Sequence, residues 1–147
     1  MNRTLLGIVK LGESPEAPCV FKRACDRARV SFKCESVSSA QEGISYLSGT
    51  APYANRRRYP MPSLIVLDWD LPESGGLQAL SWVRSRPALR YLPVVVLSDS
   101  KSQPSMKRAY DRGASSYLLK PKSFEDLVEL IRMIDRYWLA LNKTPGP

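Results

Sequence analysis

The chain has 147 residues, of which 44% are hydrophobic and 24% charged, the proportions of an ordinary globular protein. It carries a formal net charge of +8 and contains three cysteines and no histidine. The lack of histidine excludes imidazole-based nucleophile activation, a phosphohistidine carrier and most zinc sites, and the three cysteines without CxxC spacing indicate reduced thiols.

The length and hydropathy of the chain predict one cytoplasmic domain over residues 1–147. No apolar stretch approaches the roughly 18 residues of a membrane span, and the N-terminal apolar segment is too short for a signal peptide. The basic residues are spread along the chain without interleaved aromatic residues. We therefore expect a solvated basic surface and no membrane partner, and a nucleic acid is the less favoured partner.

Short apolar runs alternate along the chain with amphipathic segments. In chain order we expect a strand at 4–9, a helix at 19–29, a strand at 30–36, a helix at 38–47 capped by its first serine, a strand at 63–68, a helix at 77–86, a strand at 92–98, a helix at 104–112 closed by Gly113, a strand at 116–120 and a helix at 123–141. This alternation predicts an α/β fold.

Strands that alternate with helices favour a doubly wound, five-stranded parallel sheet, flavodoxin-like, with helices on both faces. The right-handed crossover rule favours the strand order 2-1-3-4-5. In that architecture ligands bind beyond the carboxyl ends of the strands, next to the switch point between strands 1 and 3. The residues at the strand ends are therefore the candidates for chemistry.

Three polar side chains stand at those ends. The strand LIVLD ends in Asp68, the strand PVVVLS ends in Ser98, and the strand SYLLK ends in Lys120. A buried carboxylate is costly unless something pairs with it. A carboxylate can also accept a phosphoryl group, whose oxygens a hydroxyl and an ammonium could then bind. The three residues together predict a site for phosphoryl chemistry.

The segments LIVLDWDLPESGG, PVVVLS and GASSYLLKP resemble the receiver domain of two-component response regulators, and the resemblance covers essentially the whole chain. Pro72 and Gly76 follow the acceptor position at the family's spacing. The resemblance implies that Asp68 is the phosphoacceptor, Ser98 the switch hydroxyl, Tyr117 the switch aromatic and Lys120 the lysine that contacts the phosphate.

Two further segments narrow the resemblance. PYANRRRYPMP and RYWLALNKTP are similar to segments of stand-alone receivers associated with phytochrome-type and hybrid sensor kinases. The resemblance implies a histidine kinase or phosphotransfer protein as partner, no output domain, and action by docking to other proteins. It also implies a homodimer through helix 4, strand 5 and helix 5. The chain is not expected to be an enzyme.

The sequence departs from the family's pattern after strand 1, where receivers carry an acidic pair that holds Mg²⁺ against the acceptor. This chain reads IVKLGESPE there, so Lys10, Leu11 and Gly12 take the place of the acids. Mg²⁺ prefers hard oxygen ligands, and the carboxylate pair that would supply them is missing. The sequence therefore leaves two alternatives, a receiver that binds Mg²⁺ and one that has lost it.

Three hypotheses remain. In the first, the metal site is lost, and Lys10 forms an ion pair with Asp68 in a pseudo-receiver that serves as a binding module. In the second, displaced acids rebuild the site. In the third, phosphorylation is weak and lysines carry the charge that Mg²⁺ normally supplies. The candidates for displaced acids are Glu13, Asp70 and Asp99.

The first hypothesis is favoured because a lysine places a positive charge where the metal would lie. Asp99 adds a negative charge that repels a phosphoryl group, and the side chain of Asp70 is expected to point to solvent. At the level of function, a phosphorylated signalling receiver and a phosphorylation-independent interaction module remain, with a nucleic-acid-binding domain driven by the +8 charge as the less favoured third hypothesis. Only the first should respond to an acyl-phosphate mimic.

Overall fold

The computed structural model describes residues 3–10 and 17–145 of the chain. The elements are β1 (Thr4–Ile8), α1 (Ala17–Ala28), β2 (Lys33–Val37), α2 (Ala40–Ser48), β3 (Leu64–Asp68), η1 (Pro72–Ser74), α3 (Gly75–Arg84), η2 (Pro87–Leu89), β4 (Val94–Ser98), α4 (Gln103–Asp111), β5 (Ser116–Leu119), α5 (Phe124–Ile134) and the π-helical segment η3 (Asp135–Leu141). The strands form one parallel sheet in the order β2-β1-β3-β4-β5, which confirms the predicted topology.

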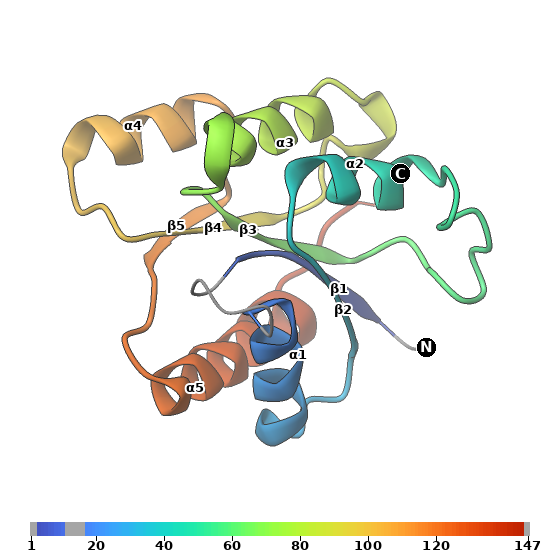
Figure 1. Cartoon of the computed structure of the whole chain (residues 1–147), viewed down its shortest axis with the longest axis horizontal. Helices are drawn as coiled ribbons and strands as arrows, with labels where there is room; N and C mark the ends of the chain where they lie inside the picture. Colours follow the sequence, from blue (N-terminus) through green and yellow to red (C-terminus); the bar gives the residue numbers. More distant parts are fainter. Residues whose placement is uncertain (1–2, 11–16, 146–147) are drawn as a thin grey trace.

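The sheet lies between two layers of helices (Figure 1). Helices α1 and α5 pack on one face, and α2, α3 and α4 cover the other. Successive strand residues alternate between two apolar clusters, as Leu5 and Leu6 do on β1 and Val66 and Leu67 do on β3. Within the described ranges, no helix is both long and apolar enough to cross a membrane.

Some element boundaries differ from the sequence prediction, because a positive φ or a helix cap shifts where the element begins. Strand β2 begins at Lys33 rather than at residue 30, because Arg29 takes a positive φ of 55° and the chain turns before it becomes extended. Ser39, and not Ser38, caps α2 by accepting a hydrogen bond from the Glu42 backbone N–H. These shifts do not change which residues end the strands at the carboxyl edge.

Candidate functional site

The polar residues at the strand ends converge at one edge of the sheet, as predicted. The parallel register places Asp68 opposite Leu97 and Ser98 opposite Leu119, so β3, β4 and β5 end side by side. Lys120 follows β5 directly, and its backbone N–H donates to the carbonyl of Ser98 at 2.9 Å. The site is therefore built by the register of the sheet.

Asp68 is a buried carboxylate surrounded by donors. Its side chain is only 2% exposed. One oxygen, Oδ1, lies 2.9 Å from the Lys120 ammonium and accepts the backbone N–H of Asp70, also at 2.9 Å. The other, Oδ2, accepts the backbone N–H of Lys10 at 3.1 Å. These contacts offset the cost of burying a negative charge at the end of an apolar strand.

Lys120 is the cation at the centre of the site, with a side chain 12% exposed. Besides Asp68, its Nζ lies 3.2 Å from Asp70 Oδ2 and 3.8 Å from Asp99 Oδ2. Burial alone would lower the pKa of this ammonium, but the hydrogen bonds and charges of Asp68 and Asp70 outweigh burial and raise it. Lys120 is therefore charged at neutral pH.

Asp70 faces the site rather than solvent, so the expectation of an outward side chain is wrong. Its Oδ1 accepts the hydroxyl of Ser98 at 2.9 Å, and its Oδ2 accepts the backbone N–H of Asp99 at 2.8 Å. Partial burial tends to raise the pKa of Asp70, but these two hydrogen bonds and Lys120 outweigh it and lower the pKa. Asp70 is a second anion of the site.

Tyr117 is half-buried and reaches toward the loop between β4 and α4. Its hydroxyl donates to the carbonyl of Ser100 at 2.7 Å and lies 2.9 Å from the hydroxyl of Ser105 on α4. The backbone N–H of Ser100 in turn donates to Ser98 Oγ at 3.1 Å. A continuous hydrogen-bonded path therefore connects Asp70 with Tyr117 through Ser98 and Ser100.

The predicted ion pair between Lys10 and Asp68 is wrong. Lys10 is exposed, and it contacts Asp68 through its backbone N–H, which any residue except proline would supply. The lysine that neutralises Asp68 is Lys120 instead. The other positions that replace the acidic pair, Leu11 and Gly12, and the candidate ligand Glu13 lie outside the described residues.

Sequence reasoning named Asp70 only as a possible metal ligand and missed Ser100 and Ser105. Asp70 lies in the turn that follows β3, so its contacts with Ser98 and with the Asp99 N–H depend on how that turn folds. No sequence signal marks Ser100 or Ser105. Their contacts with Tyr117 depend on the course of the loop and on the position of α4.

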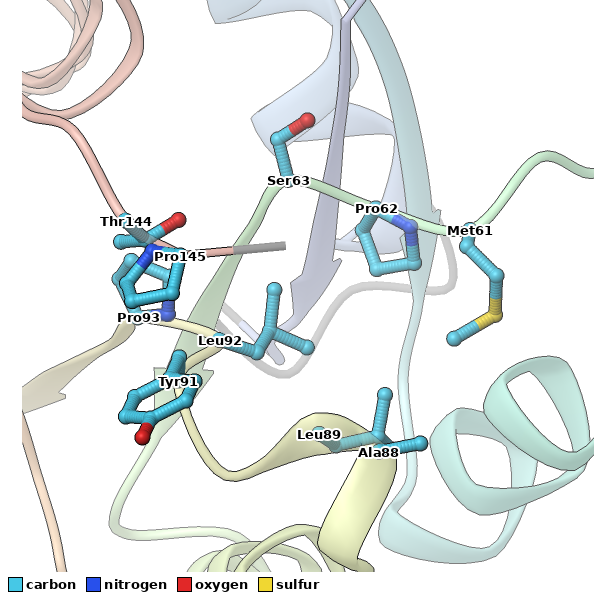
Figure 2. A pocket seen from close by; sticks show the side chains of 10 residues that line it. All are labelled: Met61, Pro62, Ser63, Ala88, Leu89, Tyr91, Leu92, Pro93, Thr144 and Pro145. Atoms are coloured by element: carbon cyan, nitrogen blue, oxygen red, sulfur yellow. The ribbon is translucent and has the colours of Figure 1, made fainter. Parts of the chain in front are cut away.

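An apolar pocket lies at the opposite edge of the sheet. Residues before β3 and β4 and the C-terminal segment surround about 450 Å³ of mainly apolar space (Figure 2). Met61 and Tyr91 are the exposed large side chains at its rim. No acid or base lines it. The chemistry of the chain is therefore expected at the carboxyl edge and not in this pocket.

The sequence of the chain matches a known protein family. The family model for the response regulator receiver domain matches residues 20–132, more than half of the sequence. The chain belongs to the response regulator receiver family. The matched segment begins after β1, so it leaves out Lys10 and the positions that follow it.

Individual receivers are also similar over much of their length. The response regulator Rcp1 of Synechocystis is 31% identical over 103 residues, which are 70% of this chain and 68% of that protein. The probable methanogenesis regulatory protein FilR2 of Methanothrix harundinacea is 44% identical over 87 residues, 59% of this chain. The match spans only 56% of FilR2.

Solved receiver structures have the same fold. The phosphorylated cyanobacterial phytochrome response regulator RcpA superposes with a TM-score of 0.83 at 25% identity, covering 99% of this chain and all of that one. Rcp1 has been solved in a Mn²⁺-bound form.

The described residues of this receiver do not fit a divalent cation. Such an ion needs free hard oxygen ligands, but the carboxylates of Asp68 and Asp70 are occupied by Lys120 and by N–H and O–H donors. Asp99 reaches Lys120 and Lys122 instead. Within residues 3–10 and 17–145, no group of three acidic, cysteine or histidine side chains is placed to hold a metal. Asp70 and Asp99 therefore do not rebuild the site.

Proposed function

We propose that this receiver is an atypical member of two-component signalling that acts by docking to other proteins, and that Mg²⁺-assisted phosphorylation does not set its conformation. One observation carries the proposal. The acceptor carboxylate, Asp68, is already neutralised by Lys120 at 2.9 Å, with two backbone N–H groups on its oxygens. A fixed ammonium thus supplies the positive charge that a metal would bring.

The strand-end residues take the family's roles in this proposal. Asp68 is the acceptor position, Ser98 and Tyr117 are the switch pair, and Lys120 is the anion-binding lysine. Their convergence at one edge supports this assignment. In this chain the donors are occupied by the carboxylates of Asp68 and Asp70.

The proposed partners are a histidine kinase or phosphotransfer protein, of the phytochrome-type or hybrid class, and a second copy of the chain. The similarity to RcpA, a phytochrome response regulator, supports the first. Exposed large apolar side chains on α4, β5 and α5 support the second, since such side chains are enriched in interface cores. They are Tyr110, Leu119 and Met133.

Intact mass after incubation with phosphoramidate or acetyl phosphate tests the proposal, with and without Mg²⁺. Phosphorylation would form a bond between an Asp68 oxygen and phosphorus as ammonia or acetate leaves. We expect no adduct on the parent chain under either condition. Lys10→Asp is the informative companion, because it returns one acid to the position of the missing pair. An adduct on Lys10→Asp alone would support a lost metal site.

A phosphorylated receiver is the second candidate, and the retained Asp68, Ser98, Tyr117 and Lys120 favour it. It predicts an adduct on the parent that depends on Mg²⁺ and is absent from Asp68→Asn. That result would overturn the phosphorylation-independent proposal. It would also direct attention to Glu13, which lies outside the described residues.

A further inference from the structure

Three donors from separate parts of the site converge on the carboxylate of Asp70. The Ser98 hydroxyl lies 2.9 Å from Oδ1, and the Asp99 backbone N–H and the Lys120 ammonium lie 2.8 Å and 3.2 Å from Oδ2. Charge-assisted hydrogen bonds of this kind are roughly twice as strong as neutral ones. The Asp70 side chain is 34% exposed, so these donors, rather than burial, hold it in the site.

Two of these donors, Lys120 and Ser98, also lie beside Asp68, where a phosphoryl group would be attached. Lys120 already bridges Asp68 Oδ1 and Asp70 Oδ2, and Ser98 ends the strand next to Asp68. The Ser98 hydroxyl and the Asp99 N–H each have one hydrogen, so neither can donate fully to two anions. Asp70 and a phosphoryl group on Asp68 would therefore compete for the same donors.

We propose that Asp70 is a built-in substitute for the phosphoryl group, which holds Ser98, the Asp99 N–H and Lys120 and thereby keeps Tyr117 turned inward without phosphorylation. This inference rests on the proposed receiver function and deepens it. Asp70 is a positioning residue in this account, because it acts on Tyr117 through other groups.

The loop between β4 and α4 connects the anion to the aromatic residue. Ser98 Oγ donates to Asp70 and accepts the Ser100 backbone N–H at 3.1 Å, while the Ser100 carbonyl accepts the Tyr117 hydroxyl at 2.7 Å. Ser105 fixes the same hydroxyl from α4 at 2.9 Å. Loss of the Asp70 acceptor leaves the Ser98 hydroxyl free to rotate, and the loop then loses the contact that anchors Ser100.

Hydrogen exchange of the backbone amides of residues 99–103 and 105 tests this device in the absence of any phosphodonor. In Asp70→Ala the exchange of this segment should become at least about tenfold faster, the effect of losing charge-assisted hydrogen bonds. Asp70→Asn keeps the shape but not the charge, and it should show a smaller increase. Unchanged exchange in both variants would overturn the inference.

Asp99→Asn is the matched control. This substitution removes a carboxylate that lies 3.8 Å from Lys120, but it keeps the backbone N–H of residue 99 that donates to Asp70. The carboxylate that is removed accepts no hydrogen bond from Ser98. We expect exchange of the same amides to stay within about twofold of the parent, the scale of a weak exposed ion pair. An increase equal to that of Asp70→Ala would mean that the loop depends on the total negative charge near Lys120 and not on the hydrogen bonds that Asp70 accepts.

A double-variant cycle identifies the route. Ser98→Ala removes the other end of the hydrogen bond, so it should speed exchange by itself and add little in the Asp70→Ala background. Additive effects would overturn the proposed connection through Ser98. The two proposals fail on different results. A phosphoryl adduct on the parent chain would overturn the proposed phosphorylation-independent function. Unchanged exchange in Asp70→Ala would overturn only the inference about Asp70.

Discussion

The ammonium of Lys120 lies 2.9 Å from Oδ1 of Asp68, and both side chains are largely removed from solvent. An ion pair in this position is costly to break from one side only, because the remaining charge stays buried without a partner. The pair therefore fixes the end of β3 to the segment that follows β5, whatever its role in signalling.

Lys120→Met should reduce the free energy of unfolding by about 3 kcal/mol, because Asp68 is left buried with only its N–H donors. Urea denaturation followed by circular dichroism measures this. The control is Lys122→Met, whose side chain is 84% exposed and 3.9 Å from Asp99, and which should change stability by less than about 0.5 kcal/mol. Equal losses in the two variants would contradict a buried ion pair at Lys120.

Lys10→Ala should leave stability within about 0.5 kcal/mol of the parent, as expected for an exposed side chain. Alanine keeps the backbone N–H that Asp68 accepts, so the contact survives the change. The measurement is again urea denaturation at neutral pH. A loss of stability comparable to that of Lys120→Met would be evidence for an ion pair between Lys10 and Asp68, which the structure does not show.

The stability difference between the parent and Asp70→Asn should depend on pH. The pKa of Asp70 is lowered in the folded state, so its ionised form contributes stability above the ordinary pKa of 3.8. That contribution is lost as the pH falls through the lowered, folded-state pKa. Thermal midpoints should therefore differ most near neutral pH and converge in acid. A gap that widens below pH 3.8 would contradict the assignment.

Gly76→Ala should lower the free energy of unfolding by about 2 kcal/mol and displace the backbone that carries Asp68. A methyl group at Gly76 would lie 2.7 Å from the Trp69 Cα and 2.8 Å from the Asp68 carbonyl oxygen, both of them backbone atoms that cannot rotate away. The exposed Gln78→Ala on the same helix is the control. A Gly76→Ala protein as stable as this control would show that the loop can move at little cost.

Much of the fold and of the site could be predicted from the sequence. Fully apolar runs such as 64–67 predict strands buried on both faces, and strands separated by amphipathic helices predict a parallel sheet. Since the carboxyl ends of parallel strands share an edge, Asp68, Ser98 and Lys120 were expected together. The structure brings them together there.

The partners of the charges could not be predicted in the same way. Lys10 and Lys120 were both at strand ends, and composition does not distinguish a lysine that points to solvent from one that points into the site. The choice depends on the register of β5 beside β4 and on the course of the chain after β1, which are set by packing over the whole sheet.

Strand periodicity and parallel topology leave few arrangements, so the order of residues along the chain is enough to predict which chemistry gathers at the edge of the sheet. The pairing of Lys120 with Asp68, and of the Ser98 hydroxyl with Asp70, depends instead on the three-dimensional packing. Several donors and acceptors of similar strength compete there within a few ångströms. The loop after β3 and the loop after β4 select among them through backbone positions that no local pattern encodes.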